Sequence, residues 1–248
     1  MKKLTAIILA AVLVFSLAAC SNNEVEPNSG PPSSTQPESS PDSASESDDS
    51  TADGDSATAD APLSGESNIL ITYFTVPETG GVDTVAGASR VVVDGEAFGN
   101  HQYVAQLIQQ SIGGDLFAIE TVQEYPGSHD ALLEFGYNEK AENARPELAS
   151  QIENIDSYDV IFIGYPNWNA DLPMPLYTFL ENNDFSGKTI IPFTVHGGSG
   201  FSGTIATIAD LQPNATVLSN GLSISRNDVP NSQSEVTEWV QSLGLTNE

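Results

Sequence analysis

The sequence predicts a doubly wound α/β fold, a five-stranded parallel sheet inside a three-layer sandwich. Strand-like and helix-like patterns alternate five times over residues 67–248, which is typical of parallel sheets with right-handed crossovers. Residues 160–163 (VIFI) are apolar at every position, as expected of a strand buried on both faces. With the strands numbered along the chain, we expect the strand order 2-1-3-4-5.

Each strand is predicted from an apolar or β-branched run. The second strand alternates in polarity, so we place it at an edge of the sheet. The five predicted strands are Asn68–Phe74, Leu116–Val122, Asp159–Gly164, Lys188–Val195 and Thr216–Ile224.

The helices are predicted between the strands and after the last one. Gly136 and Asn138 weaken the second helix, whereas Pro173 suits the first turn of the third. The predicted helices are Gln102–Ile112, Ala131–Ala144, Pro173–Asn182, Phe201–Leu211 and Ser232–Leu243.

The first twenty residues have the layout of a secretory signal. Lys2 and Lys3 precede a 16-residue run, Leu4–Ala19, that is apolar or small apart from Thr5 and Ser16 and falls short of the roughly 20 residues of a spanning helix. Cys20 is the only cysteine and follows Leu-Ala-Ala, which resembles the lipobox of bacterial lipoproteins. That resemblance implies a signal peptide over residues 1–20, lipidation of Cys20, and an anchor on the extracytoplasmic face of the cell membrane.

Residues 21–66 read as a disordered acidic tether, rich in Ser and Pro, with 11 acidic residues and no Lys, Arg or aromatic residue. Residues 67–248 form one predicted domain with 23 acidic and 5 basic residues, a formal charge of −18. This charge argues against nucleic acid as a partner. It also means that a bound phosphate must be held mostly by backbone N–H groups and hydroxyls.

Three strand ends carry unusual loops, and the predicted strand order brings them to one rim. These loops are Phe74-Thr75, Tyr165–Ala170 and Thr194–Gly203. The last contains Gly198-x-Gly200-x-x-Gly203, but it follows the fourth strand and has no acidic residue for a ribose nearby, so we do not interpret it as a dinucleotide fingerprint. The histidines are scattered and predict no metal site.

Residues 67–248 resemble a flavodoxin, of the branch with Y-P-N-W, P-M-P and H-G-G-S-G segments, which stand here at Tyr165–Trp168, Pro173–Pro175 and His196–Gly200. The resemblance implies non-covalent FMN. The phosphate loop, much like Y-F-S…G-N-T, would be split by an insertion at about residues 76–98. Within the insertion, Ser89–Gly95 looks like a strand and turn, and Arg90 either approaches the phosphate or pairs with a neighbouring acid.

By this resemblance the site residues fall into two groups. The phosphate group is Thr75, Gly99, Asn100 and His101. The ring is flanked by Pro166, Asn167 and Trp168 on one side and by Thr194, His196, Gly197, Gly198 and Ser199 on the other. Two departures weaken FMN affinity. His101 replaces a threonine, and Asn169 stands where an aromatic residue often follows Trp168.

The leading hypothesis is an FMN-binding redox protein that carries electrons to or from an unidentified redox partner, without acid–base catalysis by its own residues. An acidic surface would disfavour the anionic reduced flavin and lower its potential. An NAD(P)H-dependent flavin or quinone reductase on the same fold is one alternative. A surface binding module that has lost its flavin is another.

Overall fold

The computed structural model describes residues 58–59, 67–79 and 89–245, all within one compact unit that begins at Ala52. Its parallel sheet confirms the predicted fold and order. From one edge inward, the strands are β5 (Asp115–Ala118), β2 (Ile69–Tyr73), β6 (Val160–Pro166) and β7 (Thr189–His196). Both β8 (Thr216–Leu218) and β9 (Leu222–Ser225) pair with the far side of β7. The second predicted strand, β5, is indeed at an edge.

The fifth predicted strand is split into β8 and β9, and Pro192 of β7 explains the break. β8 pairs with Thr189 and Ile190, and β9 pairs from Phe193 onward. Pro192, between these stretches, has no N–H to donate to the ladder. Opposite it, Gly221 approaches so closely that a Cβ there would lie 2.5 Å from the Pro192 carbonyl oxygen.

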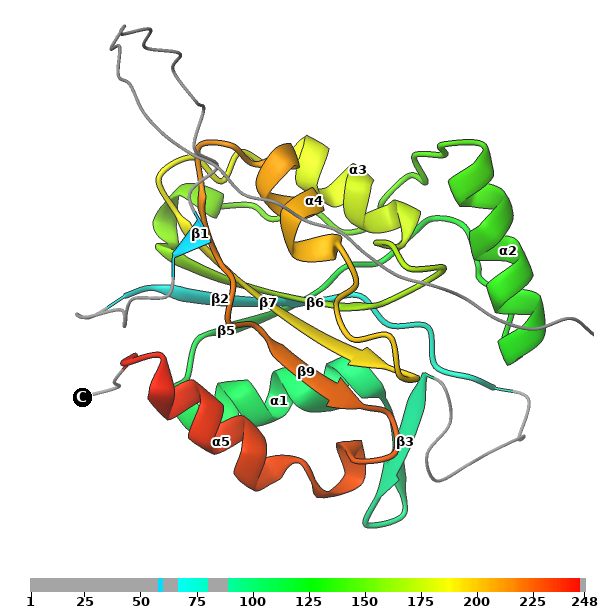
Figure 1. The fold of residues 1–248 in the computed structure, drawn as a ribbon, viewed down its shortest axis with the longest axis horizontal. Helices are drawn as coiled ribbons and strands as arrows, with labels where there is room; N and C mark the ends of the chain where they lie inside the picture. Colours follow the sequence, from blue (N-terminus) through cyan, green and yellow to red (C-terminus); the bar gives the residue numbers. More distant parts are fainter. Residues whose placement is uncertain (1–57, 60–66, 80–88, 246–248) are drawn as a thin grey trace, which may run out of the picture. The chain divides into compact units, whose positions relative to one another are not determined.

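Helices cover both faces of the sheet (Figure 1). α1 (Asn100–Ile112) and α5 (Gln233–Ser242) lie on one face, and α3 (Met174–Asn182) and α4 (Thr204–Leu211) lie on the other. α2 (His129–Ala141) packs beside α3. Two apolar clusters correspond to the two faces, one around Ile108, Phe162 and Val236, the other around Ile163, Phe179 and Ile208.

The predicted insertion contains a small antiparallel hairpin, β3 (Arg90–Val93) and β4 (Glu96–Gly99). Its turn uses Asp94 and Gly95, both at positive φ. The hairpin leads directly into α1 and packs against the short 3₁₀ helix η2 (Val229–Asn231). The insertion therefore ends at the start of α1, beside the predicted phosphate loop.

Two residues of the predicted tether, Thr58–Ala59, form the short strand β1, which pairs in parallel with β8. A second 3₁₀ helix, η1 (Ile155–Ser157), precedes β6. No helix within the described ranges has the length and apolarity needed to span a membrane. The predicted lipidation site, Cys20, lies outside the described residues.

Candidate functional site at the carboxyl ends of the strands

A pocket of about 280 Å³ opens at the carboxyl ends of β6, β7 and β9. Its lining comes from the loop after β2, the start of α2 and the loops after β6, β7 and β9. Those residues are Glu78, Ser89, His129, Leu132, Leu133, Pro166, Asn167, Trp168, Val195, His196, Gly197, Ser199 and Arg226. Six of the twelve predicted cofactor residues are in this set, from both predicted ring-flanking loops.

The loop after β6 is held in shape by a two-residue hairpin turn. The backbone groups of Trp168 and Asp171 exchange hydrogen bonds of 3.0 Å in both directions. Asn169 and Ala170 between them have φ of +53° and +59°, the pattern of a type I′ turn. Asn tolerates this left-handed conformation better than most residues, which gives Asn169 a structural reason to stand after Trp168.

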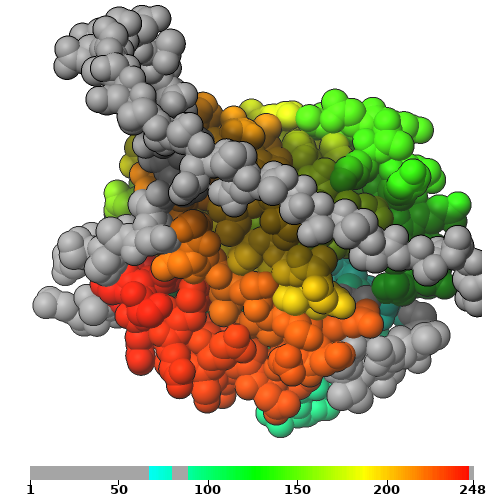
Figure 2. Space-filling view, in the orientation of Figure 1, coloured from blue at the N-terminus to red at the C-terminus, as the bar shows by residue number. Residues whose placement is uncertain are grey.

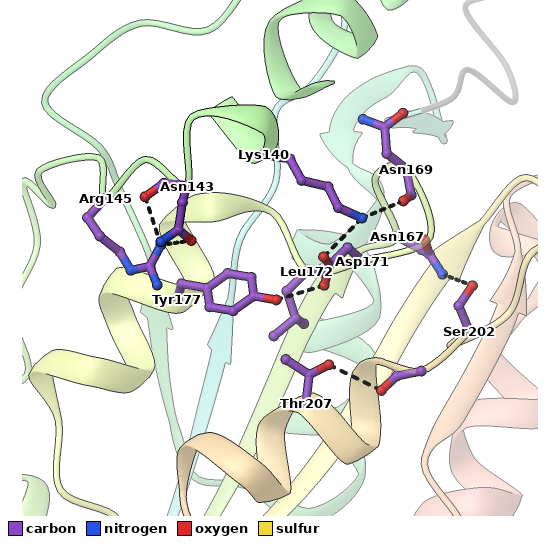
Figure 3. A network of polar contacts seen from close by, with 11 residues as sticks. Lys140, Asn143, Arg145, Asn167, Asn169, Asp171, Leu172, Tyr177, Ser202 and Thr207 are labelled. Carbon is purple, nitrogen blue, oxygen red and sulfur yellow. Dashed lines mark hydrogen bonds and ion pairs between the residues drawn. The ribbon is translucent and has the colours of Figure 1, made fainter. Parts of the chain in front are cut away.

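α2 holds this turn from outside (Figure 3). Lys140 Nζ lies 3.0 Å from Asp171 Oδ2 and donates to the Asn169 carbonyl, also at 3.0 Å. The other Asp171 oxygen accepts a hydrogen bond from the Tyr177 hydroxyl. The turn is thus tied to both α2 and α3.

Trp168 lies in the core, with only 7 % of its surface exposed. Its indole packs edge-on against Phe74 and lies close to Tyr125, at centroid distances of 5.7 and 5.6 Å. Gly136 of α2 makes room for it, since a Cβ there would stand 3.0 Å from Trp168 Cε3. Trp168 therefore contributes to one wall of the pocket, while most of its ring is packed in the core.

The loop after β7 is ordered around His196 and joined to the loop after β6. The His196 Nδ1 accepts a hydrogen bond of 2.9 Å from the Gly198 N–H, so the neutral ring carries its proton on Nε2. Partial burial lowers the pKa of His196. Asn167 donates to the Gly200 carbonyl at 2.7 Å. It also donates to Ser202 Oγ at 2.9 Å (Figure 3), and these two bonds join the two loops.

At the predicted phosphate end, Thr75 faces the start of α1. A Cβ on Gly99 would collide with the Thr75 Oγ1 and Cγ2 atoms, so glycine is required for this approach. Thr75 Oγ1 is buried and has no hydrogen-bond partner among the described residues. A buried hydroxyl in that state costs about 1–3 kcal/mol, and a ligand phosphate oxygen would satisfy it.

Some of the expected donors at this end are already engaged. The Gly99 N–H donates to Gln102 Oε1, and the Asn100 N–H donates to the Ser89 carbonyl. Ser89 also accepts a hydrogen bond at Oγ from the Glu78 N–H. Ser89 therefore joins the start of α1 to the pocket wall, and its carbonyl occupies one donor that a phosphate would use.

His101 and Thr194 point into the interior, away from the pocket. The His101 Nε2 accepts a hydrogen bond of 3.0 Å from the Val195 N–H, and the ring also bonds the Tyr165 carbonyl. The Thr194 hydroxyl donates to the same carbonyl at 2.7 Å. These contacts correct the predicted side-chain roles: any contact from His101 to a phosphate has to come from its backbone.

The flavodoxin family model matches residues 91–243, more than half of the chain and every element from β3 to α5. The chain belongs to the flavodoxin family. No curated protein matches it.

Solved structures share the flavodoxin fold. A candidate flavoprotein from Bacteroides eggerthii is 23% identical with a TM-score of 0.50, covering 73% of this chain and 100% of that one. A second, from Bacteroides uniformis, is 24% identical with a TM-score of 0.51, over 71% and 99% of the two chains. A flavoprotein from Lactobacillus acidophilus in complex with FMN is 18% identical with a TM-score of 0.46, over 70% and 99%.

Sequence reasoning missed four polar or charged residues of this flavodoxin's pocket: Glu78, Ser89, His129 and Arg226. Arg226 directly follows the last strand, β9. Its position at a strand end was the sequence feature that could have indicated a place in the site. Ser89 was noted only as part of a strand and turn. In the insertion, Arg90 Nη1 donates a hydrogen bond to the backbone carbonyl of Glu78. Arg90 thus contacts a neighbouring acidic residue, but at its backbone and not at its carboxylate.

The described ranges also form a larger hollow, of about 400 Å³, beside the carboxyl end of α3, where Thr178, Phe179 and Asn183 contribute to its lining. They contain no cluster of three His, Cys, Asp or Glu residues suited to a metal ion. The pocket formed by the predicted loops therefore remains the candidate site of this flavodoxin.

Proposed function

We propose that this flavodoxin binds FMN without a covalent bond and carries electrons between partner proteins. The observation that carries the proposal is the meeting of the loops after β6 and β7 in one pocket. The loop after β2 adds a buried hydroxyl with no described partner, Thr75 Oγ1. Asn167 Oδ1, within the pocket lining, is also buried without a described partner. Buried polar atoms in this state call for a ligand or water to complete them.

The residues present fit a flavin in two parts. Thr75, and the N–H groups at the start of α1 that remain available, suit a phosphate. The loops that contain Asn167 and His196 form opposite walls suited to a flat ring, and the hydrogen bonds of Asn167 hold these walls in place. The pocket volume of about 280 Å³ is just below the roughly 300–1,000 Å³ of small-molecule sites. Part of a bound flavin would therefore stay exposed, as transfer to a protein partner requires.

The chain's own groups bind and orient the cofactor, whereas FMN, when bound, supplies the electron transfer. Asn167 positions the loops, and Lys140 holds the turn that carries Trp168 through Asp171 and Asn169. His196, whose Nδ1 is engaged by Gly198, has its Nε2 proton as a hydrogen-bond donor. These roles concern binding and orientation, and none of them requires proton transfer.

Titration of the purified full-length chain with FMN tests the proposal. Quenching of flavin fluorescence should saturate at one FMN per chain in the micromolar range. A folded chain that leaves the fluorescence unchanged at tens of micromolar FMN contradicts the proposal and favours a binding module that has lost its flavin. Steady oxidation of NADH by the FMN-loaded chain favours a reductase over a carrier.

We also propose that lipid on Cys20 anchors the chain at the extracytoplasmic face of the cell membrane. This rests on the residues before Cys20, Leu17-Ala18-Ala19, and on the apolar run that precedes them. Metabolic labelling with a radioactive fatty acid should mark the wild-type chain and not the Cys20→Ser variant. Equal labelling of the two contradicts the assignment.

A further inference from the structure

Arg226 is a basic side chain in the pocket without a described partner. Each of the other four Lys and Arg side chains in the described ranges has a polar partner. Lys140 pairs with Asp171 and Arg145 with Glu181, while Arg90 and Lys188 donate to the carbonyls of Glu78 and Tyr158. No ion pair or hydrogen bond of the Arg226 guanidinium is found among the described residues.

The position of Arg226 is fixed by the end of β9. Its N–H donates to the His196 carbonyl at 2.9 Å, which extends the pairing of β9 with β7. A Cβ on Gly197 would lie 4.0 Å from the Arg226 Cζ, Nε and Nη1 atoms, so the guanidinium stands directly behind this loop. Figure 2 shows the segments after β7 (yellow) and β9 (orange) side by side on the surface.

The sheet places Arg226 far from the phosphate end. Thr75 follows β2, and β6 and β7 separate β2 from β9. Three strand spacings of about 4.8 Å give roughly 14 Å between the two strand ends. A phosphate group held at Thr75 is too small to reach both, so Arg226 belongs to the ring end of the pocket.

We propose that Arg226 supplies the positive charge that stabilises the reduced, anionic form of the bound flavin. The inference rests on the proposed FMN site. Uptake of two electrons and one proton leaves one negative charge on the ring system, and a guanidinium in the same pocket offsets that charge in place of a second proton. Arg226 thereby counters the acidic surface, which by itself would lower the potential of the flavin.

The other titratable side chains of the pocket lining are Glu78, His129 and His196, and none of them is a lysine or an arginine. Glu78 lies on the loop after β2, toward the phosphate end, and His129 lies at the start of α2. His196, on the neighbouring loop, has a lowered pKa because it is partly buried, so its imidazole is neutral at pH 7. The guanidinium therefore carries the permanent positive charge of the pocket lining.

The test measures the affinities of oxidised and reduced FMN for the full-length chain and three variants. Arg226→Gln removes the charge, Arg226→Lys keeps it, and Arg145→Gln is the matched control, because Arg145 pairs with Glu181 outside the pocket. The ratio of reduced to oxidised affinity is obtained from FMN titration and from the midpoint potential against a reference dye. Circular dichroism and thermal unfolding confirm that each variant is folded.

We expect Arg226→Gln to lower this ratio about tenfold, which is about 30 mV for a two-electron couple. Arg226→Lys should stay within about threefold of wild type, and Arg145→Gln should match it. An unchanged ratio in folded Arg226→Gln overturns the inference while the FMN site stands. Equal weakening of both redox states with FMN, but not with riboflavin, places Arg226 at the phosphate and also overturns it. Absence of FMN binding by the wild type overturns the site and the inference together.

Discussion

His101 joins two strands at the centre of the sheet. Its Nε2 accepts from the Val195 N–H of β7, and its ring bonds the Tyr165 carbonyl of β6. Burial lowers the pKa of this imidazole to about 3, because the protein interior disfavours the charged form. The neutral ring therefore acts as a hydrogen-bonded spacer between the carboxyl ends of the strands that flank the pocket.

This burial gives the stability a defined pH dependence. The unfolded imidazole takes up a proton near pH 6.5, whereas the folded one stays neutral until about pH 3, so acid favours the unfolded state. Between pH 8 and pH 5 the free energy of unfolding should therefore fall by about 2 kcal/mol through His101 alone. His101→Gln, which keeps a donor and an acceptor, should show a fall smaller by that amount in urea denaturation.

If His101→Gln instead loses as much stability between pH 8 and pH 5 as wild type does, the imidazole is not held neutral in the fold.

Glu78 is a buried acidic residue on the loop after β2, three residues beyond Thr75. It is 7 % exposed, it lines the pocket, and its Oε2 has no described partner. Its carboxylate opposes a doubly charged phosphate, so Glu78→Gln should tighten FMN binding by roughly threefold to tenfold. Riboflavin, which has no phosphate, should bind equally to both chains in the same fluorescence titration.

Glu181→Gln is the matched control for Glu78→Gln, since Glu181 pairs with Arg145 outside the pocket. Equal gains for FMN and riboflavin would show that Glu78 acts on the ring and not on the phosphate.

The surroundings of Trp168 could be predicted from the sequence only in part. Its place after a buried strand predicted a site at the strand ends, and the structure places Trp168 in the wall of a pocket there. The sequence could not show that Gly136, from another helix, leaves room for the indole to pack beside Phe74 and Tyr125. Its burial also means that Trp168→Ala would cost about 3–5 kcal/mol of stability, so Trp168→Phe is the more informative variant for binding studies.

At the scale of elements, the turn after β6 carries strain in one residue. Ala170 has φ of +59°, a conformation that costs roughly 1–2 kcal/mol for a residue with a Cβ. The hydrogen bonds between Trp168 and Asp171 and the contacts of Lys140 hold the turn in this shape.

Glycine at position 170 should relieve this strain. We expect Ala170→Gly to raise the free energy of unfolding by roughly 0.5–1 kcal/mol in urea denaturation. Ala206→Gly, at an exposed position inside α4, is the matched control and should lower it by about 1 kcal/mol. A loss of stability in both variants would contradict the left-handed turn.

The elements themselves were largely predictable because buried parallel strands and amphipathic helices leave strong periodic signals. The break of the last strand was not, since it depends on Pro192 of the neighbouring strand approaching Gly221. The same limit applies to His101 and Thr194: their sequence positions match a phosphate loop and a strand end, but tertiary contacts direct both side chains inward.

At the scale of the whole molecule, one pocket collects groups from four strand ends of an acidic domain. The fold brings the loops after β6 and β7 together, as the strand order predicted. It also places Arg226 behind them, which strand order alone did not indicate. The pocket lining thus combines one acidic residue, Glu78, with one arginine, Arg226.

A crystal structure of the full-length chain grown with FMN tests the central claim most directly. We predict density for the isoalloxazine ring between the loop of Asn167 and Trp168 and the loop of His196–Ser199, with the phosphate toward Thr75 and Arg226 at the ring end. FMN bound instead in the hollow beside Phe179 and Asn183, with the pocket at the strand ends empty of flavin, would contradict the account.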